Sequence, residues 1–270
     1  MATTGLGPVV ILPTPPIRPV GLFLTTALNF GWQDRYALGV KFQTTDLSPL
    51  HYEAIPSGGP CTDVNTTLTP RDFTDVEEQG AFSVIDAVTC SSIGKTPEEL
   101  NSNLAEHWAL TLSAAVAKEA MYGTGGSTHY LALDATDAST STTVHAGIAE
   151  LEERLATAIG NTQGVIHIAP SALTYAILNG AVNRRGDFYF SPSGHLVIAD
   201  AGYQAVESGS TSVIYASGPI YYALDDLASR AQYDWEFNDW THNDLLALAQ
   251  AFGIILYDPD VVFKVTATKA

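Results

Sequence analysis

The chain has 270 residues, 46% of them hydrophobic, and a formal net charge of −17. Such a length can bury a large core without disulfides or metals, and the acidity excludes a basic reader of nucleic acids, which needs clustered Lys and Arg. Two cysteines, Cys61 and Cys90, are too few for a disulfide framework or a paired-cysteine zinc site. Whether Cys61 and Cys90 form a single disulfide bond with each other is not decided by the sequence.

The N-terminal segment is apolar and rich in proline. Residues 1–33 hold one charged residue, Arg18, and five prolines. Proline interrupts helices and removes a backbone donor, and the segment lacks the basic start of a signal peptide. We therefore expect no membrane association and an extended arm that lies against other surfaces, in the same chain or in a neighbouring copy. Disorder of its first residues is the alternative.

Residues 34–94 predict β structure around a long excursion. Residues 36–42 and 81–88 alternate as strands do, and residues 48–80 between them are rich in Pro, Gly, Thr and Asp. Loops of that length are uncommon in compact domains unless they have a function. From Gln43 to Gly94 the only basic residue is Arg71, against eight acidic ones. A two-stranded projection with a solvated tip is expected.

A long helix is predicted over residues 97–122. Thr96 is a suitable N-cap, Pro97 suits the first helical position, and Glu99 completes a capping box. At about 1.5 Å per residue the helix would span roughly 39 Å. Gly123 ends it. The residues that recur on one face are Leu100, Leu104, Trp108, Leu112, Ala115 and Glu119.

The remaining pattern predicts an α/β body. Residues 127–143 read as edge strand or loop, and residues 143–159 as a second helix with Ile148, Leu151, Leu155 and Ile159 on one face. A buried strand over 164–169 and a short helix over 170–178 follow. Further strands are predicted at 187–190, 195–199, 212–216, 220–224, 254–257 and 261–266. Residues 245–252 are predicted as a helix.

A glycine-rich turn, Gly123-Thr124-Gly125-Gly126-Ser127, invites comparison with a phosphate-binding loop. A phosphate cradle needs a strand before the loop and a helix after it, so that backbone N–H groups face the anion. Here the turn follows a helix and no lysine precedes Ser127. Helix termination is the favoured interpretation.

Histidines and carboxylates form a second group to weigh. Its members are His145, His167, His195, Glu150, Glu152, Glu153, Asp187 and Asp200. Their spacing matches no metal-ligand motif, no Gly-x-Ser-x-Gly elbow is present, and neither cysteine has a histidine nearby in sequence. The run 234–237, Asp-Trp-Glu-Phe, fits a partner-binding strip or an edge strand equally well. No catalytic, cofactor-binding or metal-binding residue is assigned, and no cofactor is expected.

A series of short blocks covers most of residues 80–262. They are Cys-Ser-Ser-Ile-Gly at 90–94, Glu-Ala-Met-Tyr-Gly at 119–123, Gly-Val-Ile-His-Ile-Ala-Pro at 164–170, Arg-Arg-Gly-Asp at 184–187, Val-Ile-Ala-Asp-Ala-Gly-Tyr at 197–203, Tyr-Ala-Ser-Gly-Pro-Ile at 215–220, Asn-Asp-Leu-Leu at 243–246 with Ala249, and Tyr-Asp-Pro at 257–259. In the order and spacing of these blocks, the chain resembles the HK97-like major capsid proteins of tailed bacteriophages, in particular those from phages of actinobacteria.

The resemblance implies an α+β, HK97-like capsid fold and a structural protein without enzymatic activity. Its implied parts are an N-arm (1–33), an E-loop with flanking strands (34–94), a peripheral domain with the long spine helix (95–145), an axial domain (146–240) and peripheral return strands (241–270). It further implies hexamers and pentamers that close into an icosahedral head around double-stranded DNA, assembled in the host cytoplasm.

The implied partners are other copies of the chain, a separate scaffold protein, a portal and a possible decoration protein. Some relatives link an E-loop lysine to a neighbour's asparagine, but no lysine lies between Lys41 and Lys95. Two alternatives stay open. One is an encapsulin-type compartment shell of the same fold, and the other is a soluble α/β enzyme that uses His167 or His195 with Asp200.

Overall fold

The computed structural model describes residues 23–33, 36, 39–43, 76–91, 97–140, 143–225 and 244–269. The described strands form two main sheets and a small hairpin. The smaller main sheet has the order β1 (Leu28–Asn29), β12 (Tyr221–Leu224), β13 (Asp244–Leu256) and β4 (Phe82–Ser91). The hairpin consists of β2 (Val40–Gln43) and β3 (Val76–Gln79).

The larger sheet forms the body of the molecule. Its order is β5 (Thr136–Thr140), β14 (Val262–Thr268), β11 (Thr211–Ser217), β6 (Val165–Ile168), β9 (Leu196–Ala199), β8 (Phe188–Phe190) and β7 (Asn183–Arg185), with β10 (Glu207–Ser208) paired to β11. Within the range 241–270, β13 therefore lies in the smaller sheet and β14 in the larger one. The domain boundaries inferred from sequence stay a prediction.

The helices occur where sequence signals are strongest. The long helix α2 spans Pro97–Tyr122, as predicted, and α4 spans Val144–Ile159 with the Thr143 hydroxyl accepting from the Ala146 N–H. Gly123 and Gly160 follow these helices with φ of 61° and 59°, a conformation that favours glycine. The helix α5 spans Pro170–Leu178. Short helical turns are α1 (Phe23–Thr26), α3 (Leu131–Asp134), η2 (Ala201–Val206) and η5 (Pro259–Val261).

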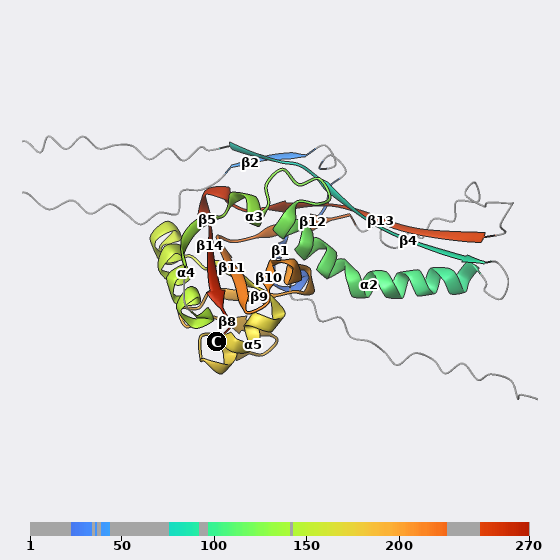
Figure 1. Ribbon diagram of the computed structural model, residues 1–270. Coiled ribbons are helices and arrows are strands. Elements are labelled where there is room, and N and C mark those ends of the chain that lie inside the picture. The colour runs from blue at the N-terminus through green and yellow to red at the C-terminus, as the bar shows by residue number, and fades with distance from the viewer. Residues whose placement is uncertain are drawn as a thin grey trace, which may run out of the picture.

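Helices pack against both main sheets (Figure 1). The larger sheet has α4 and α5 on one face and the last turns of α2 on the other. The apolar stripe of α4 packs with residues of β6, β11 and β14 in one core cluster. The long helix runs beside the paired strands β4 and β13, and its Leu100, Leu104 and Trp108 pack against Ala249 and Ala251 of β13. Together α2, β4 and β13 form an elongated arm that projects from the body, and this arm carries the surface described below.

The helix predicted over residues 245–252 is wrong. This segment belongs to β13, a strand of 13 residues. Leu, Ala and Gln favour helix intrinsically, but β4 offers ten consecutive pairing positions from Asp244↔Ser91 to Gly253↔Phe82. Such tertiary pairing commonly overrides propensity. The helical turn α3 and the edge strand β7 were not predicted.

Glycine at position 202 allows the body to dock against the long helix. A Cβ atom there would collide with the Ala114 carbonyl oxygen and lie 2.6 Å from the Lys118 backbone nitrogen. Both atoms belong to the backbone of α2, so neither can rotate away. Only a residue without a side chain permits this approach of η2 to α2.

We therefore expect Gly202→Ala to destabilise the protein by about 1–3 kcal/mol, the usual cost of forcing extra atoms into a packed region. Thermal or urea unfolding at matched protein concentration measures the change. Gly218→Ala is the control, because a Cβ there meets its nearest neighbour at an ordinary 3.8 Å. Equal stability of the two variants would refute the tight docking.

Candidate assembly surface

The smaller sheet has one face against α2 and one face turned away from it. Strand register shows which residues share the outer face, because paired residues in adjacent strands point the same way and successive residues alternate. Ile85 pairs with Gln250, and Ala87 with Leu248. Val84 and Val88, one residue out of phase, pack with the helix instead. We call the face that carries Ile85 and Leu248 the outer face.

The outer face continues across all four strands. Tyr221 of β12 pairs with Leu256 of β13 and with Leu28 of β1, and Phe30 lies two residues beyond Leu28. In the parts of β4, β12 and β13 whose side chains the structure describes, this face holds no charged residue. Its members there are Ser83, Ile85, Ala87, Tyr221, Ala223, Leu248, Gln250, Phe252, Ile254 and Leu256.

Several of these apolar side chains are exposed in the single chain. Ile85 is 59% exposed, Leu28 56%, and Phe30, Tyr221 and Leu248 between 36% and 39%. An antiparallel sheet with one solvated face normally carries polar residues there. Ile254 and Ala223 lie between these residues on the same face but are buried, so the exposed part forms two apolar patches, one at Ile85 and Leu248 and one at Leu28, Phe30 and Tyr221. An exposed apolar patch is characteristic of a surface that another protein surface covers. The outer face therefore has the exposed apolar character of a protein interaction surface.

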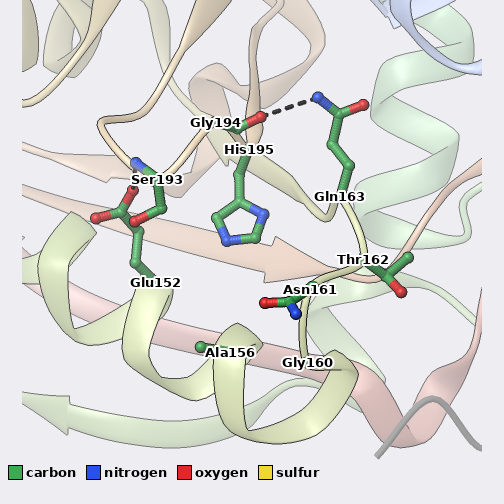
Figure 2. Close-up of a pocket in the computed structure, with 9 residues that line it drawn as sticks. All are labelled: Glu152, Ala156, Gly160, Asn161, Thr162, Gln163, Ser193, Gly194 and His195. Atoms are coloured by element: carbon green, nitrogen blue, oxygen red, sulfur yellow. Dashed lines mark hydrogen bonds between the residues drawn. The ribbon is translucent and has the colours of Figure 1, made fainter.

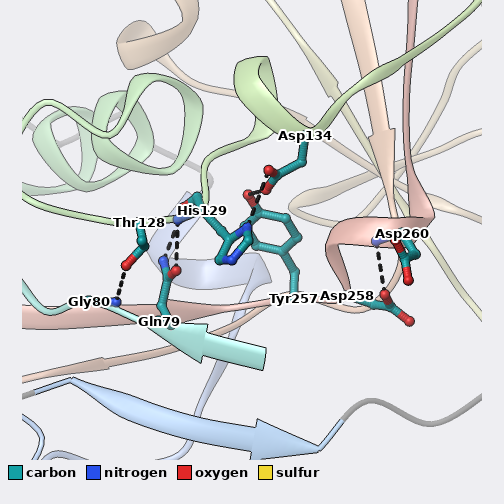
Figure 3. Close-up of polar contacts among 8 residues, drawn as sticks. All are labelled: Gln79, Gly80, Thr128, His129, Asp134, Tyr257, Asp258 and Asp260. Atoms are coloured by element: carbon teal, nitrogen blue, oxygen red, sulfur yellow. Dashed lines mark hydrogen bonds and ion pairs between the residues drawn. The ribbon is translucent and has the colours of Figure 1, made fainter. Parts of the chain in front are cut away.

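The base of the β2–β3 hairpin is anchored beside this sheet (Figure 3). The buried amide of Gln79 accepts from the His129 N–H at 2.9 Å and donates to the His129 carbonyl at 3.0 Å. The Gly80 N–H donates to the Thr128 hydroxyl at 2.7 Å. These three bonds fix the point where the chain returns from residues 44–75, which lie outside the described residues.

A second anchor joins this region to Tyr257, the residue that directly follows β13. The Tyr257 hydroxyl donates to Asp134 at 2.7 Å, and His129 Nδ1 lies 3.3 Å from the same carboxylate. Burial, followed by the Asp134 hydrogen bond, raises the pKa of Tyr257. The phenol stays protonated and acts as a donor.

The glycine-rich turn 123–127 binds an anion of its own chain. The buried Glu119 carboxylate accepts from the Gly125 and Ser127 backbone N–H groups and from the Thr124 hydroxyl. The donors that a phosphate would need are thus occupied by α2. The sequence-based interpretation as a helix terminus agrees with this geometry.

The histidines and acids weighed from sequence have structural partners. His167 is fully buried, with Nδ1 2.9 Å from the Tyr203 hydroxyl and Nε2 3.0 Å from the Ser217 hydroxyl. The buried Asp200 accepts from the Ser113 hydroxyl and from the Phe23 and Gly202 N–H groups. Both ring nitrogens of His167 and the Asp200 carboxylate are thus engaged separately, so the pairing required by the enzyme hypothesis gains no support.

The other candidates lie apart. His145 and Glu153 are exposed on α4, Glu150 pairs with Arg154, and Asp187 is 94% exposed near Arg184. Of these candidates in the described part of the chain, Glu152 and His195 line one cavity. Among the described residues, no group of three or more His, Cys, Asp and Glu could hold a metal ion. The run 234–237 and Cys61 lie outside the described residues, as does the side chain of Cys90.

No protein-family model matches the sequence, and no curated protein matches it. Solved structures do match, over nearly the whole chain. One, from Gordonia phage Cozz, has a TM-score of 0.58 and 14% identity, covering 98% of this chain and 92% of that one. The capsid of an empty GTA particle has a TM-score of 0.57 and 12% identity, covering 96% and 95%. The capsid structure of Cyanophage P-SCSP1u has a TM-score of 0.54 and 9% identity, covering 99% of this chain and 94% of that one.

These likenesses define the class of fold. The chain has the mixed α+β fold of HK97-like phage capsid proteins, and the resemblance stated from sequence is confirmed at that level. The individual subdivisions of the fold are not resolved by the comparisons. Within the described residues, no helix is long and apolar enough to cross a membrane.

The buried His167 makes stability depend on pH. Burial lowers its pKa from 6.5 to about 3, so the unfolded chain binds a proton first as the pH falls. The free energy of unfolding should therefore decrease from about pH 6.5 towards pH 3, with a slope from this residue of up to about 1.4 kcal/mol per pH unit.

We expect His167→Gln to be less stable than the parent at pH 7 and to lose stability less steeply on acidification. Urea unfolding between pH 7 and pH 5 measures both slopes. His145→Gln, at an exposed position on α4, should keep the parent's slope. Identical slopes for all three proteins would contradict the assignment.

Proposed function

We propose that the chain is the major capsid protein of a tailed bacteriophage, assembling into hexamers and pentamers of an icosahedral head that encloses double-stranded DNA. The supporting observation is the near full-length match to capsid structures. The apolar outer face adds a physical reason, since an exposed face of this kind is covered when copies assemble. In this proposal the protein resides in the virion.

The proposed division follows the fold family. Residues 1–33 serve as the N-arm, 34–94 as the E-loop with its strands, 95–145 as the peripheral domain, 146–240 as the axial domain and 241–270 as return strands. Because no lysine lies between Lys41 and Lys95, a covalent link from an E-loop lysine is not part of the proposal. Overlap of apolar surfaces holds the copies together instead.

The charge of the chain fits a container for DNA. A formal net charge of −17 repels a polyanion, so packed DNA would not adhere to the wall. A separate scaffold, a portal and a decoration protein complete the proposed set of partners. Expression of the chain alone, followed by electron microscopy, tests the proposal. Closed icosahedral particles support it, and a chain that stays monomeric at high concentration with or without its scaffold overturns it.

The outer face gives a sharper test. We expect Ile85→Lys to raise the protein concentration needed for assembly by about tenfold or more, because burial of one such side chain contributes roughly 1.5–3 kcal/mol and 1.4 kcal/mol is tenfold. Light scattering against concentration measures this threshold.

The matched control is Leu133→Lys. Leu133 is 58% exposed, as Ile85 is 59%, but it lies on α3 and not on the smaller sheet. It should assemble as the parent does. If both variants assemble normally, or both fail equally, the outer face is not the assembly surface proposed.

A further inference from the structure

A polar cavity of about 300 Å³ lies at one end of the larger sheet. It lies between the end of α4, the loop 160–163 and the turn 193–195 that leads into β9 (Figure 2). Ligand cavities begin at about this volume, so the space suits one long side chain better than a cofactor. Neither the proposed function nor the sequence-based candidates assign it a role.

The walls of the cavity are held by hydrogen bonds. Glu152 accepts from the Ser193 N–H at 2.9 Å, and the Gln163 side chain donates to the Gly194 carbonyl at 2.9 Å. The Gly164 N–H donates to His195 Nδ1 at 3.0 Å. This bond places the proton of the neutral imidazole on Nε2, and Figure 2 shows the ring between Glu152 and the loop. The cavity is therefore preformed.

The cavity favours a cation. Glu152 supplies a half-buried carboxylate, and the carboxyl end of α4 adds the negative end of its dipole with no basic residue in the last turn. Burial lowers the pKa of His195, although Glu152 raises it in part. The imidazole is thus neutral near pH 7 and does not repel a positive group.

Three of the described Lys and Arg side chains are already paired with carboxylates of their own chain. Lys41, Arg154 and Lys264 each lie within 3.5 Å of a carboxylate of the chain. On the edge strand β7, by contrast, the carboxylate near Arg184 is that of Asp187, at 3.8 Å, and the Arg184 Nε donates to the Gly186 carbonyl at 2.9 Å. Arg185 makes no ion pair within the described part of the chain.

The two β7 arginines are displayed on aromatic rings. The Arg184 guanidinium lies 6.0 Å from the Tyr189 ring centre, and that of Arg185 5.6 Å from the Phe190 ring centre. All three β7 residues are exposed. Neither arginine lines the cavity of its own chain. Arginine supported by aromatic rings is a frequent anchor of protein interfaces.

We propose that the cavity receives the guanidinium of Arg185 from a second copy of this chain, with Arg184 at its rim. The inference rests on the proposed function. Rings of identical subunits use two different patches, one from each side of every contact, and the cavity and the β7 edge are complementary in charge. A bidentate bond between guanidinium and Glu152 would fix the orientation of neighbouring bodies.

A charge exchange tests this contact. We expect Glu152→Arg and Arg185→Glu each to raise the assembly threshold at least tenfold, and the double variant to return to within about threefold of the parent. Glu152→Gln, which can keep the bond to Ser193, should show a smaller rise. Glu153→Arg makes the same charge change one residue outside the cavity and should leave the threshold unchanged.

The outcomes separate the two proposals. If the parent forms no shells, the proposed function fails. If the parent assembles and Glu152→Arg matches it, or if the double variant shows the combined loss of both singles, the contact is refuted while the shell stands. Circular dichroism and thermal unfolding check that every variant is folded. A raised assembly threshold in a folded variant then reports on the interface.

Discussion

The arm and the body of this molecule are joined around one buried carboxylate. Asp200 follows β9 of the larger sheet and accepts from Ser113 of α2, which backs the smaller sheet, and from the backbone of Phe23. The neighbouring Gly202 lets η2 approach the α2 backbone closely. Because a buried charge is costly unless hydrogen-bonded, the junction tolerates little rearrangement. The direction of the arm, and with it the position of the outer face, depends on this contact.

Two other buried polar residues, Glu119 and His167, also join elements through hydrogen bonds. Glu119 closes the turn after α2, and His167 links β6 to η2 and β11 through Tyr203 and Ser217. His167 was a candidate functional residue from sequence, yet both its ring nitrogens and the Glu119 carboxylate form hydrogen bonds with neighbouring structure. These buried polar groups therefore hold neighbouring elements in place. What the molecule offers to partners lies on its surfaces.

Sequence predicted the parts of the fold that local signals specify. The periodicity and caps of α2 and α4 located these helices almost to the residue, and α5 begins at Pro170 as expected. The strand β13 was missed because its Leu and Ala residues favour helix, and only pairing with β4 makes it a strand. The outer face was hidden for the same reason, since its residues come from strands far apart in the chain.

The cavity could not be predicted from the sequence either. Glu152 and His195 could be noted individually as ionisable residues, but 43 positions separate them and no motif spacing connects them. Only the turn before β9 brings them together, through the bonds to Ser193 and Gly164.

The negative charge of the chain limits which surfaces two copies can bring into contact. A chain with a formal net charge of −17 repels its own copies, so assembly needs surfaces that either carry no charge or bring opposite charges together. The described part of the outer face of the smaller sheet satisfies the first condition, and the proposed pairing of the β7 edge with the α4 cavity satisfies the second. Apolar contact supplies free energy without direction, whereas a bidentate ion pair supplies orientation. The proposed shell, which has to close accurately, requires both, and this fold places them on separate sheets.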